Sequence, residues 1–467
     1  MFENISDIVE AVDGFIWGSP LIILILSIGI YLTVRLGFWQ IRKLPKALKL
    51  MFSNEEEGEG EVSSFAALCT SLSATIGTGN IVGVATAIGV LAGGPGALFW
   101  MWVAALLGMA TKYAEGFLAI KYRKIDKDKH VLGGPFYYIV GGMGSKWTWL
   151  AKMFAVFGAL AGLLGIGTFS QVNGISTAVT RLFDSDKTNT VTIFGMEYSV
   201  ITIITAFVLT ICVALVVIGG LKRISNVSQV VVPFMAILYI TVVVVILIAN
   251  YKMIPQAFAE IFEGAFGIRP IAGGTFASIM MAMQKGVARG IFSNEAGLGS
   301  APIAAAAAKS NDPVRQGLIS MTGTFFDTVV ICTMTGLVIT MMGTWKDPTL
   351  EGAAVSMAAF DKGLYFLPSG VAPVIVTVCL VFFAFTTILG WNYYGERCLE
   401  YLANGNKTAV KVYRLLYIAA VFIGPYMTVS MVWNIADIFN GLMALPNIIA
   451  LFALGGIIAK ETKSSKW

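Results

Sequence analysis

Apolar residues fill most of the chain in stretches of about 20 or more, and short polar segments separate these stretches. A helix rises 1.5 Å per residue, so about 20 apolar residues cross a hydrocarbon layer of ~30 Å. The stretches are too long and too uniformly apolar for the alternating strands of a membrane barrel. They predict an all-α polytopic membrane protein with eleven transmembrane helices. The expected spans are residues 15–41, 64–91, 95–120, 148–180, 197–218, 225–249, 272–301, 316–342, 370–395, 409–431 and 435–458.

The composition supports lipid as the main solvent of this chain. Hydrophobic residues make up 57% and charged residues 13%, with a mean hydropathy of +0.79. Soluble domains carry about 25% charged residues. The five cysteines show no CxxC spacing, and the single histidine, His130, lies in a charged loop that we expect at the surface. A membrane-embedded enzyme is therefore not expected, because paired carboxylates, a histidine-rich metal cluster or a nucleophile and base would be needed.

Lysine and arginine are distributed unevenly between the connections. If the N-terminus lies outside, the cytoplasmic connections contain 21 of the 32 Lys and Arg residues, and the external ones contain six. Such an excess marks the cytoplasmic side of membrane proteins. We therefore expect a multi-pass protein of the cell membrane with its N-terminus outside and its C-terminal KETKSSKW in the cytoplasm.

Two spans contain glycine and polar residues where uninterrupted apolar residues would be expected. The second span contains Gly77 and Gly79 near its middle, and the seventh, residues 272–301, is long and rich in glycine. They lie five spans apart, which predicts two groups of five helices with opposite orientation in the membrane. Interrupted segments at matching positions of two halves indicate a transporter binding site. The expected organisation is an extra helix and amphipathic segment (1–62), two five-helix repeats (63–250 and 251–460) and a tail (461–467).

An interrupted membrane helix can bind both an anion and a cation through its backbone. Free N–H groups at the start of a half-helix attract a carboxylate, as helix N-termini do. Carbonyl oxygens released at the opposite half-helix end suit a hard cation such as Na⁺. The polar residues that flank Gly77 and Gly79 favour such a site. The alternative is that the two glycines only permit close packing of helices.

Several charged residues fall at predicted membrane depth, where charges are usually paired and functional. We expect Lys285 or Arg289 to neutralise Glu295 or Asp327, in pairs that open and close with gating. The alternative is a static ion pair at a helix end. The full set is Lys112, Glu115, Lys285, Arg289, Glu295 and Asp327.

Two motifs resemble those of a known family. The segment GGPGALFWMWVAALLG (93–108) is similar to the signature of the sodium:alanine symporter family, also called alanine/glycine:cation symporters. The segment GIFSNEAGLGSAPIAAAAA (290–308) resembles a second stretch typical of it. The resemblance implies the leucine-transporter-type fold, with ten core helices in two inverted repeats, discontinuous core helices 1 and 6, and here one extra N-terminal helix. It also implies Na⁺-coupled symport of a small neutral amino acid, alanine or glycine, into the cell by alternating access.

The resemblance assigns roles to residues of core helices 1 and 8. SLSATIGTGN matches the unwound part of core helix 1, which implies that the amides of Thr78 and Gly79 hold the substrate carboxylate. The paired threonines of core helix 8, Thr386 and Thr387, are implied sodium ligands. The alternative is that their hydroxyls only bond to the preceding turn of their own helix. The implied sodium ligands are the carbonyls of Ser73, Ile76 and Phe383 and the hydroxyls of Thr386 and Thr387, with Thr75 and Asn80 as candidates for a second cation.

The break of core helix 6 is placed by length. Counting 10–12 residues from the outer surface at Pro270 puts mid-membrane at 280–286. Phe276, Ile279 and Met280 would then line the substrate pocket. An alternative alignment places the break at 292–297.

Two further positions complete the expected substrate site. Gln171 and Asn173 in core helix 3 lie at about mid-depth, and one of them should contact substrate or ion, unless both only join helices. Trp391 lies one turn past Thr387 on the same face and could cap the pocket, or only pack.

The remaining alternatives concern coupling and partners. A proton-coupled permease of the same fold is the main alternative. A channel is less expected, because it would need a symmetric ring of polar residues lining a pore, which this sequence does not show. Residues 44–52 and 133–144 are expected on the inner leaflet, in contact with lipid. We expect no nucleic-acid partner and a monomer.

Overall fold

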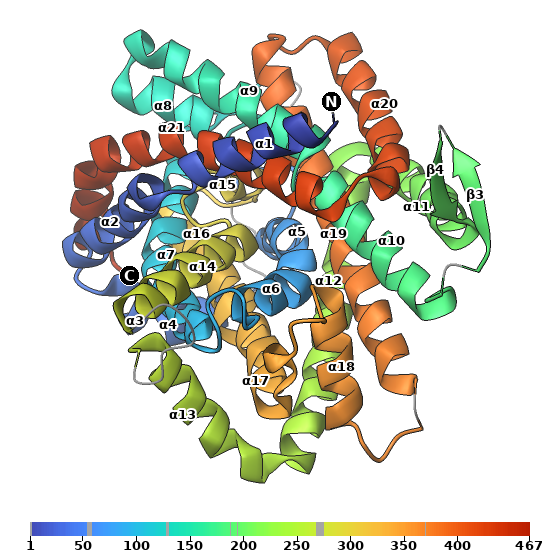
Figure 1. Cartoon of the computed structure of the whole chain (residues 1–467). Helices are drawn as coiled ribbons and strands as arrows, with labels where there is room; N and C mark the ends of the chain where they lie inside the picture. The colour runs from blue at the N-terminus through green and yellow to red at the C-terminus, as the bar shows by residue number, and fades with distance from the viewer. Residues whose placement is uncertain are drawn as a thin grey trace.

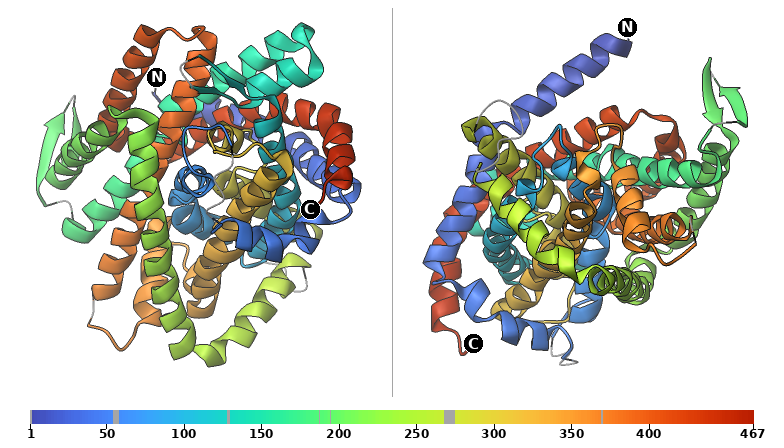
Figure 2. Two further views of the ribbon diagram at one scale, coloured as in Figure 1. Left: turned by 180° about the vertical axis from the view of Figure 1, so that it is seen from behind. Right: turned by 60° about the horizontal axis from the view of Figure 1, so that its bottom comes forward.

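The chain is folded into a bundle of helices in which α5 and α6 lie near the middle (Figures 1 and 2). The computed structural model describes residues 2–53, 58–127, 130–186, 188–193, 195–267, 275–368 and 370–467. Two antiparallel pairs of short strands are the non-helical elements of this part of the chain: β1 (Lys124–Ile125) with β2 (Val131–Leu132), and β3 (Thr190–Ile193) with β4 (Met196–Ser199).

The helices of the N-terminal half begin with an α1–α2 pair and end with the long α12. They are α1 (Phe2–Ile16), α2 (Ser19–Arg35), α3 (Trp39–Arg42), α4 (Leu44–Leu50), α5 (Ser64–Thr75), η1 (Gly79–Gly83), α6 (Val84–Ile88), α7 (Gly96–Tyr122), α8 (Pro135–Met143), η2 (Ser145–Trp147), α9 (Thr148–Leu164), α10 (Phe169–Phe183), α11 (Val200–Val217) and α12 (Gly220–Ala249).

The C-terminal half contains the second interrupted helix. Its helices are η3 (Tyr251–Met253), α13 (Ile254–Ala265), α14 (Thr275–Asn294), α15 (Ala301–Ala306), α16 (Pro313–Thr324), η4 (Phe325–Cys332), α17 (Thr333–Met342), η5 (Thr344–Lys346), α18 (Ala353–Gly363), α19 (Val371–Leu402), α20 (Lys407–Ile423), η6 (Gly424–Tyr426) and α21 (Val429–Ser464).

The membrane-spanning character of the bundle agrees with the sequence. Nine helices of the described residues are long and apolar enough to cross a membrane, and ten if α5 and the η1–α6 segment count as one bent span. The α14–α15 segment is not among them; α14 carries Lys285 and Arg289, and α15 has only six residues. The count of eleven spans therefore stays a prediction, while the multi-pass helical architecture is confirmed.

The second predicted span is interrupted where the glycines indicated. α5 ends at Thr75, and the η1–α6 segment resumes at Gly79 with a bend of 50°. η1 is a turn of π-helix. This form is rare in proteins as a whole, but it occurs often at functional sites. A second π-helix, η4, lies beside it in the span formed by α16, η4 and α17. The unwound stretch is thus Ile76–Thr78, in the middle of the bundle.

The seventh predicted span is also interrupted, but not at the position favoured by length. α14 is continuous through residues 280–286, so that placement of the break is wrong. The helix ends at Asn294, and Glu295, Gly297 and Gly299 follow with positive φ values of 57°, 90° and 81°. A helix cannot continue through left-handed residues. Gly286 instead serves close packing, since a Cβ there would lie 2.2 Å from the carbonyl oxygen of Ala97.

Hydrogen bonds join the segment just before α5 to the segment just after α15. The N–H of Glu61 donates to the carbonyl of Ala307 at 2.9 Å, and the N–H of Lys309 donates to the carbonyl of Val62 at 2.8 Å. The Arg123 guanidinium donates to the carbonyls of Ala306 and Ala308 at 2.7 and 2.6 Å and of Ser310 at 2.8 Å. These bonds satisfy carbonyls that the end of α15 leaves free.

Candidate functional site

The peptide N–H groups at the break of the α5–η1 helix bind side chains instead of helix carbonyls. The N–H of Gly77 donates to Oδ1 of Asn80 at 2.8 Å, and the N–H of Thr78 donates to Oε1 of Gln171 at 3.0 Å. In a continuous helix these N–H groups would pair with the carbonyls of Ser73 and Ala74, four residues back. The break therefore frees carbonyls on its α5 side and turns two N–H donors toward the core.

Oxygen atoms of α19 meet the carbonyl side of the same break. The hydroxyl of Thr387 donates to the carbonyls of Ile76 and Phe383, both at 3.1 Å, and the hydroxyl of Thr386 donates to that of Phe383 at 2.9 Å. The structure thus brings together four of the five predicted sodium ligands. The alternative explanation for the threonines also holds, because both bond to the preceding turn of α19. The fifth, Ser73, is buried on α5 with its hydroxyl on the carbonyl of Thr70 at 2.8 Å.

This arrangement suits a hard monovalent cation. Carbonyl and hydroxyl oxygens are its preferred protein ligands. A hydroxyl that donates one hydrogen bond keeps lone pairs that can accept a cation. The oxygens of Ile76, Phe383, Thr386 and Thr387 are therefore a chemically suitable set.

A second polar group lies where the two π-helices meet. Asn80 Nδ2 donates to Oδ1 of Asp327 at 2.8 Å. The hydroxyls of Ser293 and Thr328 donate to Oδ2 of Asp327 at 2.9 and 2.7 Å. Asp327 is fully buried, so its carboxyl group lies directly beside the break and is bonded only to neutral donors among the described residues. Thr75, the other candidate for a second cation, bonds back to its own helix at 3.3 Å.

The predicted pairing of Lys285 or Arg289 with Glu295 or Asp327 is wrong. Arg289 pairs with Asp437 of α21 at 3.0 Å, and Lys285 is exposed. The cause is the position of the break: because α14 continues to Asn294, Arg289 lies more than one turn before it and faces α21. Asp327 therefore takes neutral hydrogen-bond donors.

The break after α14 is held by two buried carboxylates. Glu295 accepts from the indole N–H of Trp391 at 2.7 Å and from the hydroxyl of Ser300 at 2.5 Å. Glu115 of α7 accepts from the N–H of Gly299 at 3.1 Å and from Asn447 Nδ2 at 2.7 Å. Trp391 therefore fixes this break, and the idea that it caps the pocket stays a prediction.

The structure separates the predicted substrate residues into two groups. Gln171 and Thr78 meet at the break, and Gly79 lies against Phe292 and Ser293 of α14, with both 3.3 Å from where its Cβ would be. Asn173 lies apart and donates to the carbonyl of Met427 at 2.8 Å.

Three predicted pocket residues belong to α14. Ile279 is half-buried and Met280 is 37% exposed, about four turns before the break, so neither lines it. The side chain of Phe276 lies outside the described residues. The residues that sequence reasoning missed here are Phe292 and Ser293; the alternative break at 292–297 would have pointed to them.

The centre of the site is closed on both sides in this conformation. Thr78, Asn80, Gln171 and Thr387 are each 1% exposed or less. On the α14 side, Phe292 packs against Trp433 with ring centroids 4.9 Å apart, and the Arg289 guanidinium lies 4.9 Å from the Trp433 ring centroid. On the other side, the hydrogen bonds of Glu61 and Val62 with Ala307 and Lys309 close the site.

Comparison with known proteins decides the family. Residues 2–466 match the sodium:alanine symporter family. This protein belongs to that family. It is 54% identical over 461 residues to an uncharacterized transporter of Haemophilus influenzae, covering 98% of this chain and 96% of that protein. It is 48% identical over 464 residues to the sodium/alanine symporter AgcS of Methanococcus maripaludis, with the same coverage.

The fold is also shared with a solved transporter structure. MhsT in complex with L-phenylalanine superimposes with a TM-score of 0.54 at 12% identity, covering 86% of this chain and 99% of that chain. This member of the sodium:alanine symporter family is therefore a transporter of the leucine-transporter-type fold and not an enzyme. The inverted arrangement of its two halves stays a prediction.

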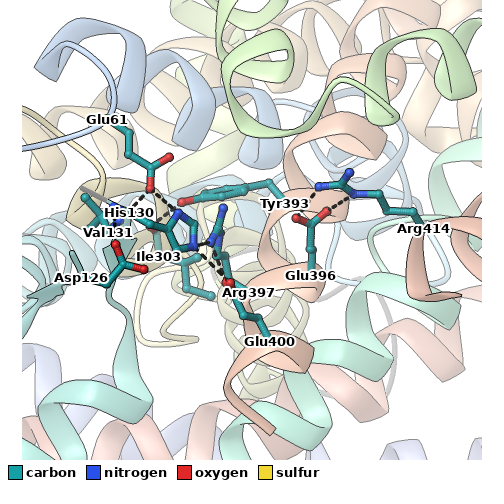
Figure 3. Close-up of polar contacts among 10 residues, drawn as sticks. All are labelled: Glu61, Asp126, His130, Val131, Ile303, Tyr393, Glu396, Arg397, Glu400 and Arg414. Atoms are coloured by element: carbon teal, nitrogen blue, oxygen red, sulfur yellow. Dashed lines mark hydrogen bonds and ion pairs between the residues drawn. The ribbon is translucent and has the colours of Figure 1, made fainter. Parts of the chain in front are cut away.

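A charged cluster joins the β1–β2 loop, α19 and the segment before α5 of the symporter (Figure 3). The ring of His130 lies 3.0 Å from Oε1 of Glu61 and 3.1 Å from Oε1 of Glu400. Arg397 pairs with Glu400 at 2.6 Å and also touches the ring, and Asp126 accepts the backbone N–H of His130 at 2.8 Å. His130 lies in the charged loop as expected and its side chain is 28% exposed, but it is held by ion pairs that the sequence did not indicate. The contacts come from α19 and from the segment before α5, which the local sequence could not place beside it.

The free energy of unfolding of this symporter should decrease as the pH rises from about 6.5 to 9. Hydrogen bonds to Glu400 and Glu61 raise the pKa of His130 to about 9, although burial and Arg397 oppose the shift. Its contribution is complete below its unfolded pKa of about 6.5 and is lost as pH rises through the folded value. Because solvent screens this half-buried site, the expected contribution to the free energy of unfolding is on the order of 1 kcal/mol. Thermal unfolding at pH 6 and 9.5 should show this loss in the wild type and a smaller one in His130→Gln; equal losses would contradict it.

Proposed function

We propose that this protein is a secondary active transporter that carries a small neutral amino acid, alanine or glycine, into the cell together with Na⁺ by alternating access. The observation that carries the proposal is the unwound Ile76–Thr78 stretch, with N–H donors on one side and a carbonyl on the other. A zwitterion and a cation need these two kinds of group. The family membership and the relative AgcS support the same function.

The substrate carboxylate would bind the N–H groups of Gly77, Thr78 and Gly79. The side-chain oxygens of Asn80 and Gln171 that now accept from the first two are neutral acceptors. Hydrogen bonds to an ionised acceptor are about twice as strong, so a carboxylate would displace them. Asn80 and Gln171 would then be released to contact the substrate.

Close packing beside Gly79 favours a small substrate side chain. A Cβ on Gly79 would lie 3.3 Å from both Phe292 and Ser293, which is tighter than ordinary van der Waals contact, and Trp433 stacks on Phe292 from the outer side. A hydrogen or a methyl group on the substrate would require the smallest movement of α14. Larger side chains would have to displace the Phe292–Trp433 pair.

Two cation sites follow from the two oxygen groups. Ile76, Phe383, Thr386 and Thr387, with the freed carbonyl of Ser73, would hold one Na⁺. Asp327, Asn80 and Ser293 would hold a second. Asn80 bonds to Asp327 and also accepts from the N–H of Gly77. A cation bound at Asp327 would therefore organise the backbone that binds the substrate carboxylate. This dependence of one ligand on the other is the requirement for coupled transport.

Alternating access would work by opening one closure at a time. The Arg289–Asp437 pair and the Phe292–Trp433 stack would separate to admit substrate from outside. The bonds between the Glu61–Val62 segment and Ala306–Ser310 would separate to release it into the cytoplasm. We place the N-terminus outside and the C-terminus inside, from the distribution of Lys and Arg.

Uptake of labelled alanine into proteoliposomes tests the proposal. With an inward Na⁺ gradient and an inside-negative potential, we expect accumulation of more than about tenfold, since the potential alone supplies about 2.3 kcal/mol per charge per 100 mV. Collapse of the Na⁺ gradient should abolish accumulation, and unlabelled glycine should compete. Uptake that ignores Na⁺ and follows a proton gradient would instead identify a proton-coupled permease and overturn the proposal.

A further inference from the structure

A charged cavity lies between the end of α19, the start of α20 and the β1–β2 loop, beside the cluster drawn in Figure 3. Its volume of about 750 Å³ falls within the ~300–1,000 Å³ that is typical of small-molecule sites. Its lining residues are different from those that we propose to bind the amino acid and Na⁺. Four of them are basic: Arg397, Lys407, Lys411 and Arg414.

The carboxylates that line the cavity already have partners. Glu396 accepts from Nε and Nη2 of Arg414 at 2.6 and 2.7 Å. Glu400 pairs with Arg397 at 2.6 Å. The third carboxylate, Asp126, accepts a backbone N–H of its own loop at 2.8 Å. The acidic groups are therefore bound within the protein and do not neutralise the lysines of α20.

Two lysines and one arginine nitrogen in the lining lack a partner. Lys407 and Lys411 are exposed and lie four residues apart on one face of α20, and neither ammonium has an ion pair or hydrogen bond in the described part of the chain. Arg397 is 8% exposed, and its Nε is buried without an acceptor among the described residues. A buried donor is unfavourable until a ligand or a water supplies an acceptor. The cavity therefore suits an anion.

The cavity also lies where a lipid-exposed helix surface begins. The Lys407–Tyr426 segment is long and apolar enough to cross a membrane. Leu415, one turn past Lys411 on the same face, is 66% exposed, and Leu416 is 53% exposed. Basic groups between membrane helices at this depth bind the headgroups of anionic lipids. The distribution of Lys and Arg places this end of α20 on the predicted cytoplasmic side.

We propose that this cavity binds the phosphate group of an anionic phospholipid of the inner leaflet. The phosphate would contact Lys407, Lys411 and Nε of Arg397, because arginine and lysine are the usual protein partners of phosphate. The acyl chains would lie along the exposed leucines of α20. Because α19, α20 and the β1–β2 loop all line the cavity, a bound lipid would stabilise the packing of these three elements.

Thermal unfolding of the purified full-length protein in detergent tests the site. Added phosphatidylglycerol should raise the Tm by at least about 2 °C, whereas zwitterionic phosphatidylcholine should leave it unchanged. Inorganic phosphate lacks acyl chains and should give a smaller shift at the same concentration. An equal or larger shift with inorganic phosphate would overturn the assignment to a lipid. Equal shifts with the two lipids, or no shift with phosphatidylglycerol, would overturn the site.

A pair of double variants separates this site from a general attraction of anionic lipid to basic surfaces. Lys407→Gln with Lys411→Gln removes two exposed charges, so the protein should fold normally and lose most of the shift caused by phosphatidylglycerol. Lys146→Gln with Lys152→Gln removes two exposed lysines at the start of α9, outside the cavity, and should retain the full shift.

Equal shifts in the two double variants would contradict the proposal. These measurements need neither Na⁺ nor alanine, so their outcome is independent of the proposed transport function.

Discussion

Replacing Gly77 by alanine is expected to lower Na⁺-driven alanine uptake by at least about 100-fold. A Cβ at this position would lie 2.5 Å from Oγ1 of Thr387 and 2.8 Å from Oε1 of Gln171. Both atoms belong to groups that the proposed site uses, the cation oxygens of α19 and the partner of the Thr78 amide. The methyl group must push one of them away, so it damages carboxylate and cation binding together. A 100-fold loss corresponds to about 2.7 kcal/mol.

The matched control for this prediction is Gly83→Ala in the same interrupted helix. A Cβ at Gly83 would meet only Cδ of Arg289, at 3.9 Å, which is ordinary van der Waals distance. Uptake by this variant should stay within about twofold of the wild type. Both variants are compared at equal amounts of folded protein, judged by size-exclusion chromatography and thermal unfolding. Normal uptake by Gly77→Ala would show that substrate and cation bind elsewhere.

Asp327→Asn is expected to weaken Na⁺ activation of uptake by at least about 100-fold. The carboxylate accepts hydrogen bonds from Asn80, Ser293 and Thr328, and it is the one charged group that contacts Asn80 in the described part of the chain. An amide of the same shape removes the charge that attracts the cation in a medium of low dielectric. It also places an N–H₂ group against donors, which adds an unfavourable contact.

Measurement of uptake against Na⁺ concentration separates this effect from misfolding. The half-saturating Na⁺ concentration should rise in Asp327→Asn, while alanine uptake at very high Na⁺ should partly recover. Asp186→Asn, which changes an exposed carboxylate in the β3 loop region, should leave both values unchanged. An Asp327→Asn protein with wild-type Na⁺ dependence would show that a single cation, at the α19 oxygens, suffices.

Local sequence located the first interrupted helix correctly because its signal is local. Gly77 and Gly79 lie with polar neighbours inside an otherwise apolar stretch. At such residues, polar side chains can replace the backbone carbonyls as partners of the N–H groups, so the helix is interrupted there. The second interrupted helix was misplaced by length. Its segment contains several glycines, and only the tertiary structure separates Gly286, which packs against Ala97, from Gly297 and Gly299, which adopt left-handed conformations.

Charge partners could not be predicted from the chain. Arg289 faces Asp437, which lies 148 residues away, and His130 faces Glu400, which lies 270 residues away. The sequence places each charge at a depth but does not specify which helix lies opposite. The same limitation hid the meeting of Asn80 with Asp327.

The sequence by itself determined that lipid surrounds this protein, that its backbone forms helices, and that one helix is interrupted near Gly77 and Gly79; the structure places the unwound residues at Ile76–Thr78. These properties depend on apolar length and on the conformational freedom of single residues, which are both local. Only the tertiary structure decided where the second break lies, which oxygens converge on the first, and how the buried charges are matched. Those depend on the packing of distant helices, and burial in a medium of low dielectric makes the resulting polar contacts strong.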